Sequence, residues 1–331
     1  MPRWQYTKGL HALGNGLHAW LAPDGSWGWS NAGLIEDSGQ TLLVDTLMDL
    51  PCTQEMLEAM RAAVPAASAI DTLVNTHANA DHIFGNQLLR DARIIASQAC
   101  KEDMPHRPPA QYAQWQREWR EMGEFGRFWY EILGSRFNFQ DIELVLPSET
   151  FSGTLQLTVG TKQVELLEVG PAHTRGDVLV YVPQDKVVFT GDIIFVGAHP
   201  AIWAGPVSNW IKACERILAW DVETVVSGHG PITDKHGVRE MRDYLDYLLG
   251  AARRCHAAGM NYEQAADSLQ NDKYARWGEA ERLVANVYAC YREIDPTLAP
   301  VEITHMLGLM ARRYYARKGS CGCGQTGEHS H

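Results

Sequence analysis

Four loops that carry potential metal ligands constrain this sequence most strongly. The first has the sequence HANADH (77–82) and follows an apolar run at 70–75 that we expect to be a β-strand. The other three contain His173, Asp192 and His229, and each stands at the carboxyl end of another apolar run. Because strand ends in layered α/β folds hold loop side chains on a rigid backbone, we expect these donors to converge on one site.

The types of donor indicate a metal site with open coordination positions. Within the first loop, His77, Asn79, Asp81 and His82 can each offer a ligand atom. Imidazole and carboxylate donors without cysteine suit Zn²⁺ or Fe²⁺. Such an ion lowers the pKa of bound water to about 7, so hydroxide is available at neutral pH to attack a polarised carbonyl. We expect Asp81 to orient this nucleophile and to carry its proton.

Strand-like and helical patterns alternate around these loops. Helical spacing predicts helices at 52–63 and 207–219. Short apolar runs predict strands within 10–22 (a hairpin) and at 31–36, 41–45, 70–75, 93–97, 155–159, 163–169, 178–182, 187–190 and 223–227. This order predicts an α/β fold in which two sheets pack together with helices outside.

The predicted organisation has three parts. Residues 1–235 form the catalytic domain, interrupted at 100–148 by a helical insertion rich in aromatic residues. A helical extension follows at 236–318, for which three roles stay open: closing the pocket, forming a homodimer interface, or, for the amphipathic face at 236–257, ordinary core packing. Residues 319–331 are rich in glycine, and we expect a flexible tail there rather than a metal-handling segment. The tail contains four metal-capable side chains: Cys321, Cys323, His329 and His331.

The metal motifs together resemble those of the metallo-β-lactamase-fold hydrolase superfamily. The resemblance covers residues 10–235 and is carried by HANADH (77–82), by the histidine of GPAHTRGD, by FTGD and by SGHG. It implies an αββα sandwich with a dinuclear metal site along one edge, in an enzyme that is a metal-dependent hydrolase.

The resemblance also implies a role for each motif residue. It places His77, Asn79 and His173 around a first metal, Asp81, His82 and His229 around a second, and Asp192 between the two. Asp45 closes the predicted strand at 41–45 and matches a position that supports the metal loop from behind.

Asn79 departs from the usual pattern of the resembled family, His-x-His-x-Asp-His. A neutral amide oxygen is a poorer ligand than imidazole for a borderline metal such as Zn²⁺. We therefore expect the first site to bind metal more weakly, or to hold a different metal. In the alternative, the Asn79 amide only forms a hydrogen bond with a neighbouring ligand.

Aromatic residues near the motifs predict an apolar pocket over the metals. Trp27 and Trp29 lie in a glycine-rich loop, and Phe195 and Trp203 lie in the irregular loop after the third motif. Irregular loops at strand ends often line sites, so we expect these four residues to bind substrate rather than merely to pack. His199 is a candidate catalytic donor to the substrate, and a surface or supporting role is its alternative.

The leading prediction is a hydrolase that uses a metal-bound hydroxide to cleave an ester, lactone, thioester or amide bond in a hydrophobic small molecule. Zinc is the expected cofactor, at one or two ions per chain, with iron as the alternative.

Two other reactions on the resembled fold stay open. His77, His173 and Asp192 match the ligands of mononuclear Fe(II) enzymes, as a persulfide dioxygenase would require. The three further ligands around the second metal argue against that reading. A hydrolytic dehalogenase of an aromatic substrate is suggested only by the tryptophan-rich surroundings.

The net charge and the hydropathy of the sequence disfavour some classes of binding partner. Lys and Arg number 29 against 40 Asp and Glu, so the net charge is −11, which disfavours nucleic-acid binding. No apolar run approaches the roughly 18 residues of a membrane helix. Residues 1–10 lack the layout of a signal peptide. We therefore expect a cytoplasmic protein with a small-molecule substrate and no membrane partner.

Overall fold

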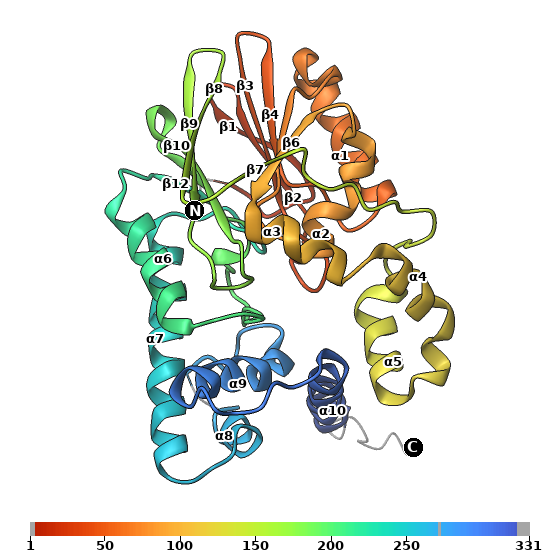
Figure 1. The fold of residues 1–331 in the computed structure, drawn as a ribbon, viewed down its shortest axis with the longest axis vertical. Coiled ribbons are helices and arrows are strands. Elements are labelled where there is room, and N and C mark those ends of the chain that lie inside the picture. Colours follow the sequence, from red (N-terminus) through yellow and green to blue (C-terminus); the bar gives the residue numbers. More distant parts are fainter. Residues whose placement is uncertain (1–3, 271–272, 323–331) are drawn as a thin grey trace, which may run out of the picture.

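The computed structural model describes residues 4–270 and 273–322, with backbone only for 319–322, and shows two β-sheets packed face to face between helices (Figure 1). The seven-stranded sheet contains, in order, β1 (Gly9–Gly14), β2 (Leu17–Leu21), β3 (Ala32–Asp37), β4 (Gln40–Val44), β5 (Thr72–Val74), β6 (Arg93–Ser97) and β7 (Glu149–Phe151). The five-stranded sheet has the order β12-β11-β10-β9-β8 and contains β8 (Thr154–Val159), β9 (Lys162–Glu168), β10 (Val178–Val182), β11 (Val187–Phe189) and β12 (Thr224–Val226).

Parallel pairing in both sheets brings the predicted metal loops to one edge. β4 pairs parallel to β5, and β11 pairs parallel to β12, so the loops after the two strands of each pair leave their sheet at the same end. The ion pair of His82 with Asp192 shows that the loops of the two sheets meet. Apolar side chains from the facing sheets, Ile35 and Phe189 among them, form the core between them. The predicted metal loops therefore lie directly beyond the packed core of the sandwich.

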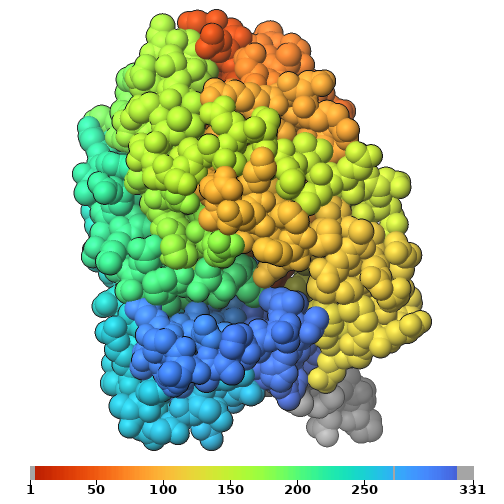
Figure 2. Space-filling view, in the orientation of Figure 1, coloured from red at the N-terminus to blue at the C-terminus, as the bar shows by residue number. Residues whose placement is uncertain are grey.

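Helices cover the outer faces of the sandwich and extend beyond it. They are α1 (Leu50–Ala63), α2 (Ala80–Ile83), α3 (Gln98–Asp103), α4 (Pro109–Glu118), α5 (Gly123–Trp129), α6 (Val207–Ala219), α7 (Lys235–Ala257), α8 (Tyr262–Ser268), α9 (Leu283–Ile294) and α10 (Ile303–Gly322). α10 lies between α9 and α5, so the C-terminal helices meet the insertion below the sandwich (Figures 1 and 2).

One apolar core joins the insertion, the C-terminal helices and the outer face of the five-stranded sheet. Phe128 of α5 is fully buried within it and packs edge-on against Tyr314 of α10 and Trp27. Phe128 thus links the insertion and the C-terminal helices to the loop of Trp27, which we expected to lie near the metals.

The predicted α/β sandwich with its helical additions is confirmed, and local differences have simple causes. β7 was not predicted, because its three residues, Glu-Thr-Phe, are only partly buried and carry little apolar signal. α10 continues to Gly322, into the segment whose glycine content predicted a flexible tail. Cys323, His329 and His331 lie outside the described residues, as does the Cys321 side chain. Among the described residues, no helix is both long and apolar enough to cross a membrane.

Candidate metal centre and active site

Short segments at strand ends position every predicted metal ligand. His77 and Asn79 occupy the loop after β5, while Asp81 and His82 lie on the one-turn helix α2. The others come from the other sheet: His173 from the loop between β9 and β10, Asp192 from a 3₁₀ turn (Gly191–Ile193) after β11, and His229 from the loop after β12. All of these imidazole and carboxylate side chains are buried.

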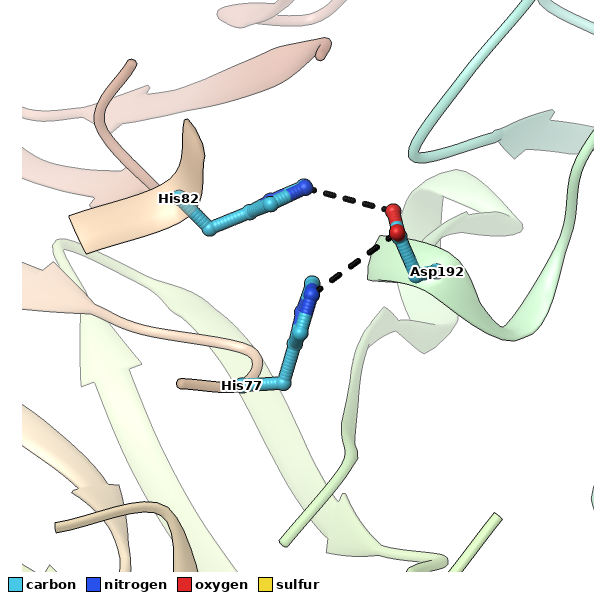
Figure 3. Close-up of side chains that lie close together, drawn as sticks. All are labelled: His77, His82 and Asp192. Atoms are coloured by element: carbon cyan, nitrogen blue, oxygen red, sulfur yellow. Dashed lines mark ion pairs between the residues drawn. The ribbon is translucent and has the colours of Figure 1, made fainter. Parts of the chain in front are cut away.

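Asp192 is the centre of this cluster. His82 Nε2 lies 3.2 Å from its Oδ1 atom, and His173 Nε2 lies 3.2 Å from Oδ2. The Nε2 atoms of His77 and His229 lie 3.8 and 3.5 Å from Oδ2. Figure 3 shows His77 and His82 both pointing at the Asp192 carboxylate. One carboxylate therefore faces four imidazole nitrogens, as a residue between two metal positions would.

Asp81 provides a second carboxylate close by. Its Oδ2 atom lies 3.3 Å from His229 Nε2 and 3.9 Å from His82 Nε2. Two groups of three residues therefore hold their ligand atoms within 4.8 Å of one another: His77, His82 and Asp192, and Asp81, His82 and His229. His82 belongs to both groups.

Unsatisfied atoms in the cluster fit a bound metal. The Nε2 atoms of His77 and His82 and the Oδ1 atom of Asp192 are buried without a hydrogen-bond partner among the described residues. Buried polar atoms are rarely left unpaired, because each costs free energy. Imidazole nitrogens beside ionised carboxylates are the ligands expected for a divalent cation of the zinc type. The residues present thus fit the metal.

The pKa values point the same way. Burial lowers the pKa of His173 to about 4 and that of His77 well below its ordinary value, so both rings are neutral at pH 7. Burial also opposes charge on His229, but nearby carboxylates, Asp192 first, outweigh it and raise its pKa to about 9. Burial tends to raise the pKa of Asp192, yet the surrounding histidines hold it well below the ordinary value. The ionised carboxylates of the cluster therefore favour a positive charge beside them, as a bound cation would supply.

A second layer of hydrogen bonds fixes the ligands. The buried Asp45 carboxylate accepts from His82 Nδ1 at 2.9 Å and from the backbone and side chain of Thr76 at 2.7 Å. His229 Nδ1 lies 3.0 Å from the Gly25 carbonyl, to which it donates. These contacts turn Nε2 toward the cluster. The structure thus places Asp45 where the resemblance implied.

Asn79 contacts a neighbouring ligand. His173 donates from Nδ1 to the Ala201 carbonyl, which leaves its Nε2 atom as an acceptor. The Asn79 Nδ2 atom lies 2.9 Å from this Nε2 atom and donates to it. The amide thus occupies the lone pair that a metal would use. This geometry matches the alternative in which Asn79 forms a hydrogen bond with a ligand.

Asp177 anchors the loop that carries His173. Its buried carboxylate accepts from the backbone and hydroxyl of Thr174 and from the Ala172 backbone. Burial raises the pKa of Asp177 to about 7, although these donors act in the opposite direction. The carboxylate thus ties both flanks of His173 to one point.

A cavity of about 70 Å³ opens onto the metal cluster. Its floor includes Asp81, His173, Asp192 and His229. Its walls are mostly apolar and come from the early loops, the insertion and the loop after β11: Trp27, Met48, Tyr112, Leu133, Phe195 and Trp203. Phe195 stacks on the His229 ring with centroids 5.0 Å apart. The predicted aromatic wall is therefore present at Trp27, Phe195 and Trp203.

Two residues predicted to act on the substrate lie elsewhere. Trp29 packs on Phe137, with ring centroids 4.6 Å apart, and lines a separate small cavity, whereas its neighbour Gly28 lines both cavities. His199 is buried beside Tyr244, whose hydroxyl lies 3.0 Å from its Nδ1 atom. The His199 backbone N–H donates to the Gly278 carbonyl of the helical extension at 2.9 Å, and His199 is not among the residues that line the metal cavity. The structure does not bring either residue to the metal cavity.

Sequence reasoning missed two arginines that line the cavity, Arg107 and Arg282. Arg107 follows α3 in the insertion, and Arg282 ends a 3₁₀ turn (Ala280–Arg282) before α9. Neither belongs to a motif, and both lie far along the chain from the metal ligands. Only a prediction of which helices cover the site could have found them.

Comparison with known proteins agrees with this geometry. Residues 25–229 match the profile described as "Metallo-beta-lactamase superfamily", which spans all the metal loops. The chain belongs to the metallo-beta-lactamase superfamily. This membership agrees with the two groups of buried His and Asp side chains that could hold a metal ion.

Relatives within the superfamily are distant. The chain is 22% identical over 252 residues to the 2,4-dinitroanisole O-demethylase subunit alpha of Nocardioides sp. (strain JS1661), covering 74% of this chain and 66% of the relative. It is 23% identical to the acyl-coenzyme A thioesterase MBLAC2 of Gallus gallus, covering 69% and 80%. It is also 23% identical to the hydroxyacylglutathione hydrolase of Brucella ovis, covering 48% of each protein. The chain thus spans only about half to four fifths of these relatives.

Solved structures share the fold at low sequence identity. The sec-alkylsulfatase Pisa1 from Pseudomonas sp. superposes with a TM-score of 0.65 at 16% identity, covering 89% of this chain and 52% of that one. The metallo-beta-lactamase from Pontibacter korlensis gives a TM-score of 0.56 at 17% identity, covering 72% and 99%.

Proposed function

We propose that this chain is a zinc-dependent hydrolase that cleaves an ester, lactone, thioester or amide bond in a hydrophobic small molecule. The observation that carries the proposal is a buried cluster of potential ligands that opens onto an aromatic-walled cavity, in which three ligand atoms lack a hydrogen-bond partner among the described residues. The thioesterase and hydroxyacylglutathione hydrolase relatives support the reaction class. When bound, the metal supplies a Lewis acid and lowers the pKa of a water molecule.

The residues of the site have different roles in this proposal. Asp192 and the four histidines would hold the metal, with Asp45 fixing the His82 ring. Asp81 lines the cavity as well as the cluster, so its carboxylate can orient a water molecule and take its proton. Trp27 and Trp203 bind the apolar part of the substrate and exclude bulk water, which strengthens the electrostatic interactions inside.

A substrate panel with metal analysis tests this function. Protein purified without added metal is analysed for zinc and iron and then assayed against esters, lactones, thioesters and amides with medium-length apolar groups. We expect zinc in the protein and hydrolysis that a chelator abolishes and zinc restores. Iron together with oxygen uptake on a thiol persulfide would favour a dioxygenase instead. Halide release from a haloaromatic compound, without hydrolysis of the panel, would favour a dehalogenase.

Asn79 gives a separate prediction about metal content. Because its amide competes for the His173 lone pair and is a weak ligand, we expect fewer than two tightly held metal ions per chain. Replacing it with histidine, Asn79→His, should raise the metal content toward two, because imidazole is the better ligand. Elemental analysis after dialysis against a weak chelator measures this. Two tightly held zinc ions in the unmodified protein would contradict the prediction.

A further inference from the structure

The metal cavity is too small to hold a whole substrate. Its volume is about 70 Å³, whereas sites for small molecules commonly enclose about 300–1,000 Å³. Two further cavities adjoin it and share lining residues with it. A substrate that reaches the metals must therefore extend into at least one of these branches.

The two branches differ in chemistry. The first, which we call the aromatic branch, has a volume of about 190 Å³ and lies under α4, α5 and α10, lined by Trp115, Trp129, Ile132 and Leu307 among others. The second, the polar branch, has a volume of about 420 Å³ and is lined by Asp103, His106, Thr174 and Arg175 among others. One branch suits an apolar group and the other suits a charged or strongly polar one.

Arg107 and Trp203 are common to both branches and to the metal cavity. The Arg107 guanidinium carbon lies 5.2 Å from the centroid of the Trp203 ring, so the cation packs on the indole. These two residues therefore mark the junction where an extended substrate must pass.

Arg107 is half-buried, and no acidic side chain of the described residues forms an ion pair with it. The carboxylate that lines the polar branch, Asp103, is bound by Arg175 at 2.6 Å and also faces His106 at 3.7 Å. The polar branch thus keeps one guanidinium whose charge is not neutralised. A guanidinium fork matches carboxylate, sulfonate and phosphate oxygens.

Arg282 occupies a different position. It is buried, donates to the His199 carbonyl, and lies 3.6 Å from Glu279. Its guanidinium carbon is 4.1 Å from the centroid of Trp27. Arg282 therefore supports the aromatic wall and is paired with Glu279, although its buried Nε atom has no hydrogen-bond partner among the described residues. Arg107 is the cation at the junction that forms no ion pair with them.

We propose that Arg107 forms an anion-binding subsite at this junction, and that the substrate is amphiphilic, with an apolar group in the aromatic branch and an anionic group toward the polar branch. The substrate class rests on the proposed hydrolase function. The anion subsite itself does not, because it follows from the geometry of the cavities.

Binding of a non-hydrolysable pair tests the subsite directly. Octane-1-sulfonate and octan-1-ol share an alkyl chain and differ in charge, and tryptophan fluorescence reports their binding near Trp27 and Trp203. Arg107→Gln should weaken octane-1-sulfonate binding roughly tenfold and leave octan-1-ol binding unchanged, since one charge-assisted contact is lost. Arg107→Lys should recover part of the affinity because it restores the charge without the fork. Equal affinity of the sulfonate for the unmodified protein and Arg107→Gln would overturn the subsite.

Arg120 offers a matched control. It also lies in the insertion and packs on a tryptophan, with its guanidinium carbon 4.4 Å from the Trp119 centroid, but its side chain is exposed. Arg120→Gln should leave binding of both compounds unchanged. If it weakened sulfonate binding as much as Arg107→Gln, the effect would be one of overall charge and the proposal would fail.

Two thioesters extend the test to turnover. Octanoyl thioesters of 3-mercaptopropionate and of N-acetylcysteamine differ in the charge of the leaving group. We expect Arg107→Gln to raise KM roughly tenfold for the anionic thioester alone. Equal kinetics in both proteins would overturn the assignment of an amphiphilic substrate while the hydrolase function stood. Failure of the unmodified protein to hydrolyse either compound, with sulfonate binding still dependent on Arg107, would count against thioester hydrolysis and not against the subsite.

Discussion

Replacing His82 with alanine is expected to abolish hydrolysis and to remove most of the bound metal. His82 belongs to both groups of potential ligands, and its Nε2 atom lies 3.2 Å from Asp192 Oδ1. Its Nδ1 atom is held by Asp45, so no other side chain can take its place without moving this pair. Metal analysis of His82→Ala and its rate of hydrolysis relative to the unmodified protein measure the effect.

His236 provides the control for this variant. Its side chain on α7 is 76% exposed, so His236→Ala should keep the metal content and activity of the unmodified protein. A circular dichroism spectrum of His82→Ala that matches the unmodified protein would separate loss of metal from loss of fold. Full activity in a folded His82→Ala protein would refute the assignment of the metal centre.

Much of the site was predictable because its chemistry is local in sequence. Each metal loop follows a short apolar strand, and parallel pairing of β4 with β5 and of β11 with β12 brings the loops together. The strand pattern that predicts the sandwich therefore also predicts that the donors converge. Asp45 follows the same logic, because it directly follows β4.

The walls of the cavity were harder to predict, because they depend on packing between distant segments. Trp27 and Trp29 stand two residues apart in one loop, yet only Trp27 lines the metal cavity. His199 was expected to reach the substrate, but its backbone pairs with Gly278, about eighty residues further along the chain. Arg107 lines the junction from the segment between α3 and α4. No local pattern encodes these contacts.

Replacing Asp45 with asparagine is expected to weaken metal binding and activity by about 10- to 100-fold, as is typical of residues that orient metal ligands. Asn preserves the volume of the side chain and tolerates the left-handed backbone at this position, where φ is 64°. The substitution removes the negative charge, however. Both carboxylate oxygens of Asp45 accept hydrogen bonds from Thr76 or His82, so the amide NH₂ group of Asn must face one of these donors. We also expect the free energy of unfolding to fall by about 1–3 kcal/mol, since a buried donor is left without its partner.

Asp49 makes it possible to separate these two effects. It is also buried and caps α1 by accepting from the Cys52 backbone at 2.8 Å, but it contacts none of the metal ligands among the described residues. Asp49→Ala should lower the free energy of unfolding by about 0.5–2 kcal/mol, as loss of a helix cap does, and leave the metal affinity unchanged. Metal titration of both variants, beside urea unfolding, gives the comparison. If the two variants lost stability equally and neither lost metal affinity, Asp45 would have a structural role only. A loss of metal affinity in Asp45→Asn alone would show that Asp45 holds His82 in place for the metal.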